Sequence, residues 1–339
     1  MAENAMEQIV STLRQSGATW YPERGELRNI RVVGHTPKND HYIYDTVIDF
    51  ANGSERLAVK VLRTNKSGLQ GVKTLAARET ENLQSVYVLC EKKKISGVPR
   101  PLGDFSELGA IVSEKLSGIP LQSIIMKAAL LPGYADHGTL HYAAKCTGDW
   151  LRKFHRASAD MPEPFDTAGL QNDLEKLCTN CKVEGLDERS IRKILTGTSA
   201  ILSRSKKTMP SSAVLNDFTP LNVIITEGGV GFSDFAHMGK RGNSFHDVAM
   251  FLASVEALEK YPFCDRSITS EVQNSFLEAY GASASELQVL RVLKMKILLS
   301  MFAQGRANKE SALRKKVMWA NVMKRFIQQA ADRSMAPAA

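Results

Sequence analysis

The sequence lacks any apolar run that approaches the ~20 residues a helix needs to cross a bilayer. Its most apolar stretch, residues 289–302, is interrupted by Arg291, Lys294 and Lys296. The first residues have neither the basic start nor the apolar core of a secretory signal. With 339 residues, 43% of them hydrophobic and 24% charged, the chain can form one large or two modest domains. We therefore expect a globular, cytoplasmic protein.

Cysteine is also scarce, because the chain has only five, an odd number, and they are widely spread. This pattern argues against a disulfide framework and fits reduced thiols. Cys178 and Cys181 form a C-x-x-C pair, but no second pair of Cys or His lies nearby at the spacing of a zinc site. A redox pair is expected in a thioredoxin-like βαβ setting, whereas residues 174–193 have a helical, polar pattern. We interpret the pair as incidental.

The net charge of +8 favours anionic partners such as nucleotides, phosphorylated substrates or lipid surfaces, without choosing among them. Part of the excess is local, at residues 314–316 and 324–325, where a solvated helix face is the simplest interpretation. No nucleic-acid recognition motif accompanies the charge, so we expect no nucleic-acid partner. A peripheral contact with a membrane surface through the basic C-terminal helices stays open.

The first third of the sequence predicts a strand-rich domain. Residues 3–16 have the spacing of an amphipathic helix, which we expect Gly17 to end. A turn-rich loop is predicted at residues 34–40, and a helix at residues 68–90. Strands are expected at residues 30–33, 42–50 and 57–62, with a final hairpin within residues 105–116.

The rest of the sequence predicts mostly helices. They are expected at residues 121–131, 139–157, 170–204 and from 246 onward, and short strands at 214–215, 223–225 and 230–235. Because the pattern changes near residues 113–118, we expect an N-terminal lobe of residues 1–112, a hinge of residues 113–118 and a helical lobe of residues 119–339.

The strongest chemical signal is a pair of polar loops that follow short strands. Asp217 and Asn222 lie five residues apart between two apolar strands, and Asp234 follows the next strand. Phosphoryl transfer requires this inventory: one carboxylate accepts the proton of the attacking hydroxyl, while an amide and a second carboxylate hold Mg²⁺ against phosphate oxygens. Taken singly, each loop also fits an ordinary turn, because Asp and Asn favour turns.

A lysine within a predicted strand is the next signal. Lys60 lies among residues that should be buried, and an unpaired buried charge is costly. The following helix offers Glu79 and Glu81, which differ by about 200° of rotation, so only one can face the strand. Glu79 shares the apolar stripe of that helix, and we choose it as the partner. The alternative is a lysine at a sheet edge that extends to water.

The order of these features resembles the protein-kinase-like superfamily and, within it, the aminoglycoside phosphotransferase family. Residues 112–118 resemble the family's connector between lobes, and residues 151–155 its L-x-x-[LF]-H helix end. The family motifs H-G-D-x-x-x-x-N, I-D-[FW] and D-[LV]-A are matched by Leu215-Asn216-Asp217 through Asn222, Ser233-Asp234-Phe235 and Asp247-Val248-Ala249. The resemblance spans about residues 27–255.

The resemblance implies an α+β, two-lobed protein-kinase-like fold, with an antiparallel sheet and one helix in the N-terminal lobe and a mainly helical C-terminal lobe. It also implies that ATP and Mg²⁺ bind. Lys60 would contact the α- and β-phosphates of ATP and be held by Glu79. The main chain at Ser113, Glu114 and Leu116 would bind the adenine.

For the chemical step, the resemblance implies that Asp217 is the catalytic base and that Asn222 and Asp234 are magnesium ligands. Asp247 would brace the catalytic loop by accepting backbone hydrogen bonds. The implied activity is an ATP- and Mg²⁺-dependent kinase that moves the γ-phosphoryl group to a hydroxyl of a small molecule such as an aminoglycoside, choline or a sugar. Two alternatives stay open: a glycolipid or phosphorylated-sugar acceptor at the membrane surface, and a catalytically inactive nucleotide-binding scaffold.

The sequence departs from the family pattern at three places. Leu215 replaces the usual histidine two positions before the catalytic aspartate, and Asn216 replaces Gly or Arg. The expected phosphate-covering loop, residues 34–40, holds a single glycine. His35 and His41 lie in or beside that loop; we interpret them as surface turn residues, with an approach to ATP as the alternative.

Overall fold

The structure, a computed structural model, describes residues 2–64, 68–131, 133, 135–261, 263–307 and 313–334. The chain divides into two compact units. The first contains Met1–Gly118 and Thr226–Met238, and the second contains Ile119–Ile225 and Gly239–Ala339. The segment that carries Asp234 therefore belongs with the N-terminal unit, although it follows the helices of the second unit in sequence.

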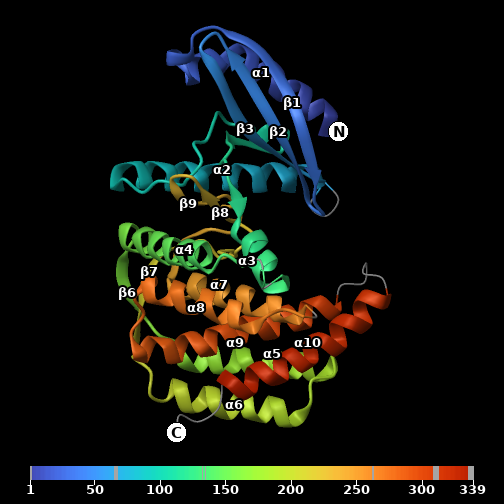
Figure 1. The fold of residues 1–339 in the computed structure, drawn as a ribbon, viewed down its shortest axis with the longest axis vertical. Helices are drawn as coiled ribbons and strands as arrows, with labels where there is room; N and C mark the ends of the chain where they lie inside the picture. The colour runs from blue at the N-terminus through green and yellow to red at the C-terminus, as the bar shows by residue number, and fades with distance from the viewer. Residues whose placement is uncertain are drawn as a thin grey trace. The chain divides into compact units, whose positions relative to one another are not determined.

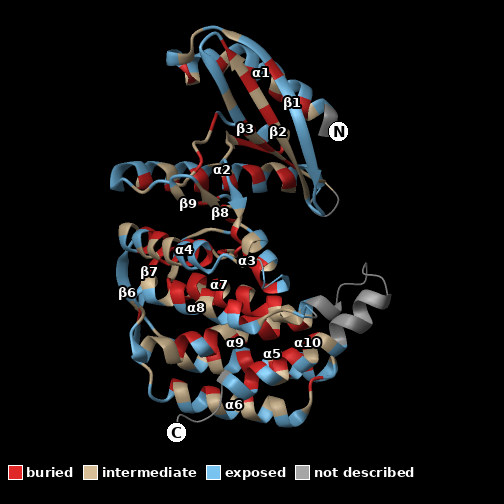
Figure 2. Cartoon of the chain, in the orientation of Figure 1, coloured by how far each residue is buried: buried red, intermediate tan, exposed pale blue. Residues whose placement is uncertain are grey.

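The first unit is built on a four-stranded antiparallel sheet (Figure 1). β-Branched and aromatic residues alternate along its strands, so buried positions recur at every second residue of β3 (Figure 2). Ile9 and Leu13 of α1 pack in the same core as Ile48 and Val59 of the sheet. The elements are α1 (Ala2–Trp20), β1 (Leu27–Pro37), β2 (His41–Phe50), β3 (Gly53–Leu62), α2 (Gly68–Lys93), β4 (Ala110–Glu114) and β9 (Gly229–Phe232).

Gly17 does not end the first helix, which corrects the expectation from the sequence. α1 continues to Trp20. A Cβ atom at Gly17 would lie 2.6 Å from Leu27 Cδ1. The glycine therefore allows the helix to pack closely against the first strand, and this packing outweighs the local tendency of glycine to interrupt a helix.

The loop expected at residues 34–40 is also wrong in extent. β1 runs to Pro37 and stays paired with β2 to its last residue, where Pro37 lies opposite Tyr42. The register shifts between Val32 and Gly34, so the glycine lies beside a β-bulge rather than in a turn. Only residues 38–40 connect the strands, and the Lys38 amide donates to the His41 carbonyl at 2.8 Å.

The hairpin expected within residues 105–116 is a single strand. The 3₁₀ turn η2 (Ser106–Leu108) precedes β4, which pairs with β3. β4 places Ile111 opposite Lys60 and Ser113 opposite Ala58. The hinge residues thus begin at the end of the strand that flanks the lysine.

The second unit is mostly helical (Figure 1). The expected long helix at 170–204 is in fact two helices, because Gly185 adopts a left-handed φ of 98° and Asp187 caps the next helix. The helices are α3 (Leu121–Leu130), α4 (His137–Ala157), α5 (Thr167–Val183), α6 (Glu188–Leu202), α7 (Phe245–Glu256), α8 (Arg266–Tyr280), α9 (Ala284–Ala307) and α10 (Leu313–Ser334). No helix in the described part of the chain is long and apolar enough to cross a membrane.

The strands of the second unit are short. β7 (Thr208–Val214) lies between β6 (Asp160–Pro164) and β10 (Gly239–Asn243), two strands that the sequence pattern did not reveal. β5 (Ile119–Pro120) pairs with β8 (Val223–Thr226). The loop between β7 and β8 carries Asp217 and Asn222.

An aromatic core supports that loop. Trp150 of α4 stacks on Phe154 at 5.7 Å between ring centroids and on Phe218 at 6.0 Å. Phe218 also contacts Phe251 of α7 at 5.9 Å. Because Phe218 follows Asp217 directly, its burial fixes the backbone of the loop.

The Cys178–Cys181 pair is buried on α5. The Cys181 thiol lies 3.5 Å from the Leu299 carbonyl, to which it donates. Burial raises the pKa of Cys178 to about 11 and that of Cys181 to about 12. Both sulfurs are therefore protonated at neutral pH, as expected of packing residues rather than of a redox pair.

Candidate active site

Lys60 and Glu79 form a buried ion pair in the first unit. The ammonium of Lys60, on β3, donates to both carboxylate oxygens of Glu79, on α2, at 2.9 and 3.0 Å. The two side chains are 17% and 6% exposed. The pairing expected from the helical stripe, with Glu79 rather than Glu81, is therefore present.

The charges in this cluster depend on one another. Burial lowers the pKa of Lys60, but the carboxylates of Glu79 and Asp234 outweigh it, so the net pKa shift is upward. Burial raises the pKa of Glu79, and the neighbouring Lys60 opposes this effect. The ammonium of Lys60 is thus firmly charged and held at a fixed position.

We expect Glu79→Leu to lower the free energy of unfolding by about 3 kcal/mol, because it leaves the buried ammonium of Lys60 with only Asp234 nearby. The double variant Lys60→Met/Glu79→Leu should recover part of the loss, because it removes both charges. Urea unfolding followed by circular dichroism measures both values. A single variant as stable as the native chain would contradict this view of the pair.

Asp234 completes the cluster in the first unit. It follows β9, and its Oδ1 lies 3.5 Å from Lys60 Nζ. The same oxygen accepts a hydrogen bond from the Ala236 amide at 3.0 Å. The carboxylate is therefore fixed by its own turn and lies beside the ammonium of Lys60.

The segment around Asp234 is anchored to α2 by residues that the sequence analysis missed. Buried Asn82 donates from its side chain to the Phe235 carbonyl at 2.9 Å, and Arg78 donates to the Ala236 carbonyl at 3.1 Å. Asn82 lies one helical turn after Glu79, on the same buried stripe. A polar residue on a buried stripe was the available signal, since such a residue needs a partner.

A glycine makes room for the strand before Asp234. Gly97 has a φ of 91°, and a Cβ atom there would lie 2.0 Å from the Val230 carbonyl oxygen. The Gly97 carbonyl accepts the Phe232 amide at 2.9 Å. Any side chain at Gly97 would displace β9 and with it the carboxylate of Asp234.

The hinge residues are held at the edge of the same sheet. The Glu114 amide donates to the Arg100 carbonyl at 2.9 Å, and the Tyr21 hydroxyl donates to Glu114 Oε1 at 2.9 Å. Ser113 pairs with Ala58 on β3, and Leu116 lies near Gly231. Ser113, Glu114 and Leu116 therefore all lie in the unit that holds Lys60.

Asp217 and Asn222 meet in the second unit. The Asn222 side-chain amide donates to the Asp217 Oδ2 at 2.9 Å and to its carbonyl at 3.1 Å. The Thr219 carbonyl accepts the Asn222 amide at 3.0 Å, which closes the turn between them. The five-residue spacing therefore brings the two side chains together, as the motif predicted.

Asp247 braces this loop from α7, as expected. Its Oδ2 accepts the Leu215 amide and its Oδ1 the Asn216 amide, both at 2.8 Å. Asn216 has a left-handed φ of 61°, a conformation that favours Gly and Asn. Asn216, which stands where Gly or Arg is usual in the motif, is therefore suited to this backbone turn.

Two further residues extend the brace. His155, near the end of α4, lies 3.1 Å from Asp247 Oδ2 through Nε2 and 3.1 Å from the Tyr280 hydroxyl through Nδ1. Leu215, at the position of the family's histidine, is fully buried. His155 therefore serves as scaffold. No sequence signal identified Tyr280.

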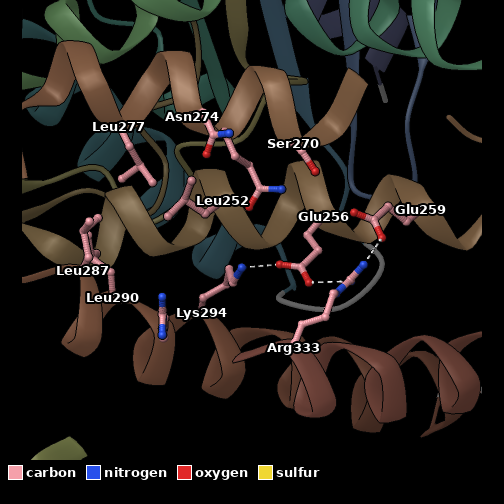
Figure 3. Close-up of a pocket in the computed structure, with 12 residues that line it drawn as sticks. Leu252, Glu256, Glu259, Ser270, Asn274, Leu277, Leu287, Leu290, Lys294 and Arg333 are labelled. Carbon is pink, nitrogen blue, oxygen red and sulfur yellow. Dashed lines mark hydrogen bonds and ion pairs between the residues drawn. The ribbon is translucent and has the colours of Figure 1, made fainter. Parts of the chain in front are cut away.

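A pocket in the second unit lies among α7, α8, α9 and α10 and has a volume of about 410 Å³ (Figure 3). Two buried carboxylates, Glu256 and Glu259, line it. Arg333 donates to both at 3.0 Å, and Lys294 also pairs with Glu256. Because the chain's own cations neutralise these carboxylates, the pocket is not an acidic site for a polycation.

No family model matches the sequence, and no curated protein is similar enough in sequence to count as a relative. Solved structures do share its fold. A glucosamine kinase aligns with a TM-score of 0.54 at 14% identity, over 90% of this chain and 94% of that one. An ADP-bound aminoglycoside phosphotransferase aligns with a TM-score of 0.53 at 15% identity, over 94% and 98%.

A choline kinase from Streptococcus pneumoniae aligns with a TM-score of 0.50 at 14% identity, over 96% of this chain and 99% of that one. At these identities the likeness shows the fold alone. The α+β, protein-kinase-like fold of the small-molecule kinases, expected from the motifs, is thereby confirmed.

Proposed function

We propose that this protein is an ATP- and Mg²⁺-dependent kinase that phosphorylates a hydroxyl of a small molecule. The observation that carries the proposal is the buried Lys60 ammonium, held between the carboxylates of Glu79 and Asp234. A lysine fixed in this way suits the phosphates of a nucleotide. The fold, shared with small-molecule kinases, supports the same class of reaction.

The proposed magnesium ligands are hard oxygen donors. Asp234 has a carboxylate, and Asn222 has a side-chain amide oxygen; the Asn222 amide nitrogen donates to Asp217. Mg²⁺ is commonly bound by one or two protein oxygens together with substrate phosphates and water. The two side chains fit this ion, which would neutralise charge on the phosphates during transfer.

The remaining roles follow from the chemistry of the side chains. Asp217 would accept the proton of the acceptor hydroxyl as its oxygen attacks the γ-phosphorus, and ADP would leave. Lys60 would hold the α- and β-phosphates, while the main chain at Ser113, Glu114 and Leu116 would hold the adenine. Asp247 acts indirectly, because it only positions the loop that carries Asp217.

The structural neighbours support a broad class of acceptor rather than one compound. Their names state that these neighbours act on glucosamine, aminoglycosides and choline, all small polar hydroxyl compounds. We propose an acceptor of this kind. In the pocket of Figure 3, Lys294 and Arg333 already pair with the carboxylates of Glu256 and Glu259. This pocket therefore gives no reason to prefer a polycationic aminoglycoside over the other acceptors.

A coupled assay of ADP release tests the proposal. We expect basal ADP release that requires Mg²⁺ and rises when one compound in a panel of amino sugars, sugars and amino alcohols is added. Mass spectrometry of the product should show a gain of one phosphoryl group. Nucleotide binding without any Mg²⁺-dependent turnover would instead identify a catalytically inactive scaffold. A protein that binds no nucleotide would refute both the kinase and the scaffold.

A further inference from the structure

The two histidines of the β1–β2 hairpin lie on opposite faces of the sheet. His35 pairs with Tyr44 and stacks on its ring at 5.8 Å. His41 is two residues before Ile43, which pairs with Lys60. Because side chains alternate along a strand, His41 lies on the face that carries Lys60, and His35 on the other.

The ring of His41 is held in one orientation. Its side chain is 15% exposed, and its Nδ1 lies 2.7 Å from Asp40 Oδ1. The carboxylate accepts a hydrogen bond from Nδ1–H, which fixes this tautomer. Among the described residues, no group hydrogen-bonds the second ring nitrogen, Nε2, so that atom is available to a ligand.

The charges that act on His41 are those of the proposed nucleotide site. Burial lowers the pKa of His41, and the ammonium of Lys60 lowers it further. The carboxylates of Asp40 and Asp234 oppose the shift, but the net direction is downward. Without a ligand the imidazole is therefore mostly neutral at pH 7, and it senses both Lys60 and Asp234.

The β1–β2 hairpin differs from the glycine-rich loops of other nucleotide-binding proteins. Glycine-rich loops cover phosphates with main-chain N–H groups. Here the connection is only residues 38–40, and the single glycine of the segment, Gly34, lies beside a β-bulge within β1. A side-chain donor on the face of this hairpin that carries Lys60 would compensate for a shorter, glycine-poor connection.

We propose that His41 is a phosphate-binding residue, whose Nε2–H donates to a phosphate oxygen of the bound nucleotide while Asp40 holds Nδ1. The inference rests on the proposed kinase function and adds to it a residue that replaces the missing glycine-rich loop. In the neutral tautomer held by Asp40, Nε2 carries no proton. It gains one from the buffer when the polyphosphate binds: a buffer acid loses the proton, an Nε2–H bond forms, and the imidazole becomes an imidazolium.

This proton uptake gives the inference a signature of its own. The complex holds more protons at His41 than the free protein does, so the affinity for ATP decreases as pH rises through the pKa of His41 in the complex. Asp40, Lys60 and Asp234 are the charged groups that act on the ring. A residue that only stabilised the hairpin would not change the proton count of binding.

Isothermal titration calorimetry of Mg-ATP in two buffers of different ionisation enthalpy measures the affinity for ATP and the number of protons taken up on binding. We expect His41→Ala to weaken ATP binding about tenfold, the usual effect of a lost charge-assisted hydrogen bond, and to reduce the proton uptake. Adenosine, which lacks phosphates, should bind both proteins equally. His35→Ala, on the opposite face of the same hairpin, should behave as the native chain.

Asp40→Asn provides a second variant that keeps the imidazole in place, and it should reduce proton uptake with a smaller loss of affinity. Native ATP affinity and native proton uptake in both His41→Ala and Asp40→Asn would overturn the inference, while the kinase proposal would stand. Equal weakening of ATP and adenosine would also overturn it, since that result indicates a structural role. If the native chain binds no ATP, the kinase proposal itself fails.

Discussion

Asp217→Asn should lower kcat by about 10²- to 10⁴-fold, the range typical of a lost general base, while the affinity for Mg-ATP changes little. The substitution keeps the shape of the side chain but removes the oxygen charge that would accept the hydroxyl proton. The loop itself should persist, because Asp247 holds the Leu215 and Asn216 amides and Phe218 is buried in the aromatic core.

Steady-state kinetics and nucleotide titrations on the same preparation separate the two effects. Asp160→Asn is a suitable control, because Asp160 is a partly exposed carboxylate of the second unit that pairs with Arg241. It should retain native kcat. Turnover of Asp217→Asn within about threefold of the native rate would be too small a change for a general base and would remove Asp217 from that role.

Asp234→Asn should reduce both Mg-ATP affinity and kcat, with a loss of turnover of about 10²-fold or more, because a neutral amide is a much poorer magnesium ligand than a carboxylate. The fold should tolerate the change. The side-chain oxygen of Asn can still accept the Ala236 amide, and Lys60 keeps its pair with Glu79.

The dependence of turnover on Mg²⁺ concentration distinguishes a lost metal ligand from general damage. We expect the half-saturating Mg²⁺ concentration to rise in Asp234→Asn. Asp104→Asn is a matched control, because Asp104 accepts the Ser106 amide in a turn of the same kind in the same unit. An unchanged Mg²⁺ dependence in Asp234→Asn would exclude this carboxylate as a ligand.

Local spacing was enough to predict the pairs whose partners lie on one motif or one helical stripe. Glu79 was identified as the partner of Lys60 because only one of two glutamates could share the stripe of α2. Asp217 and Asn222 meet because five residues make one turn between two strands. The brace by Asp247 followed from the family resemblance, and the two amide bonds confirm it.

The features that were missed depend on contacts between distant parts of the sequence. Gly17 stays within a helix because Leu27 packs against it, and Gly34 lies in a strand because β2 pairs beyond it. Asn82 anchors a segment more than 150 residues away, as its bond to Phe235 shows. No local pattern reports such contacts, since they exist only when the sheet and helices are assembled.

Our central proposal is that Lys60 binds the phosphates of a Mg-nucleotide and that Asp234 and Asn222 are ligands of its metal. A crystal structure with Mg²⁺ and a non-hydrolysable ATP analogue tests it most directly. We expect Lys60 at the α- and β-phosphates, Asp234 and Asn222 on the metal, and Asp217 facing the γ-phosphoryl group. A nucleotide bound away from Lys60, or a metal that contacts neither Asp234 nor Asn222, would contradict the account.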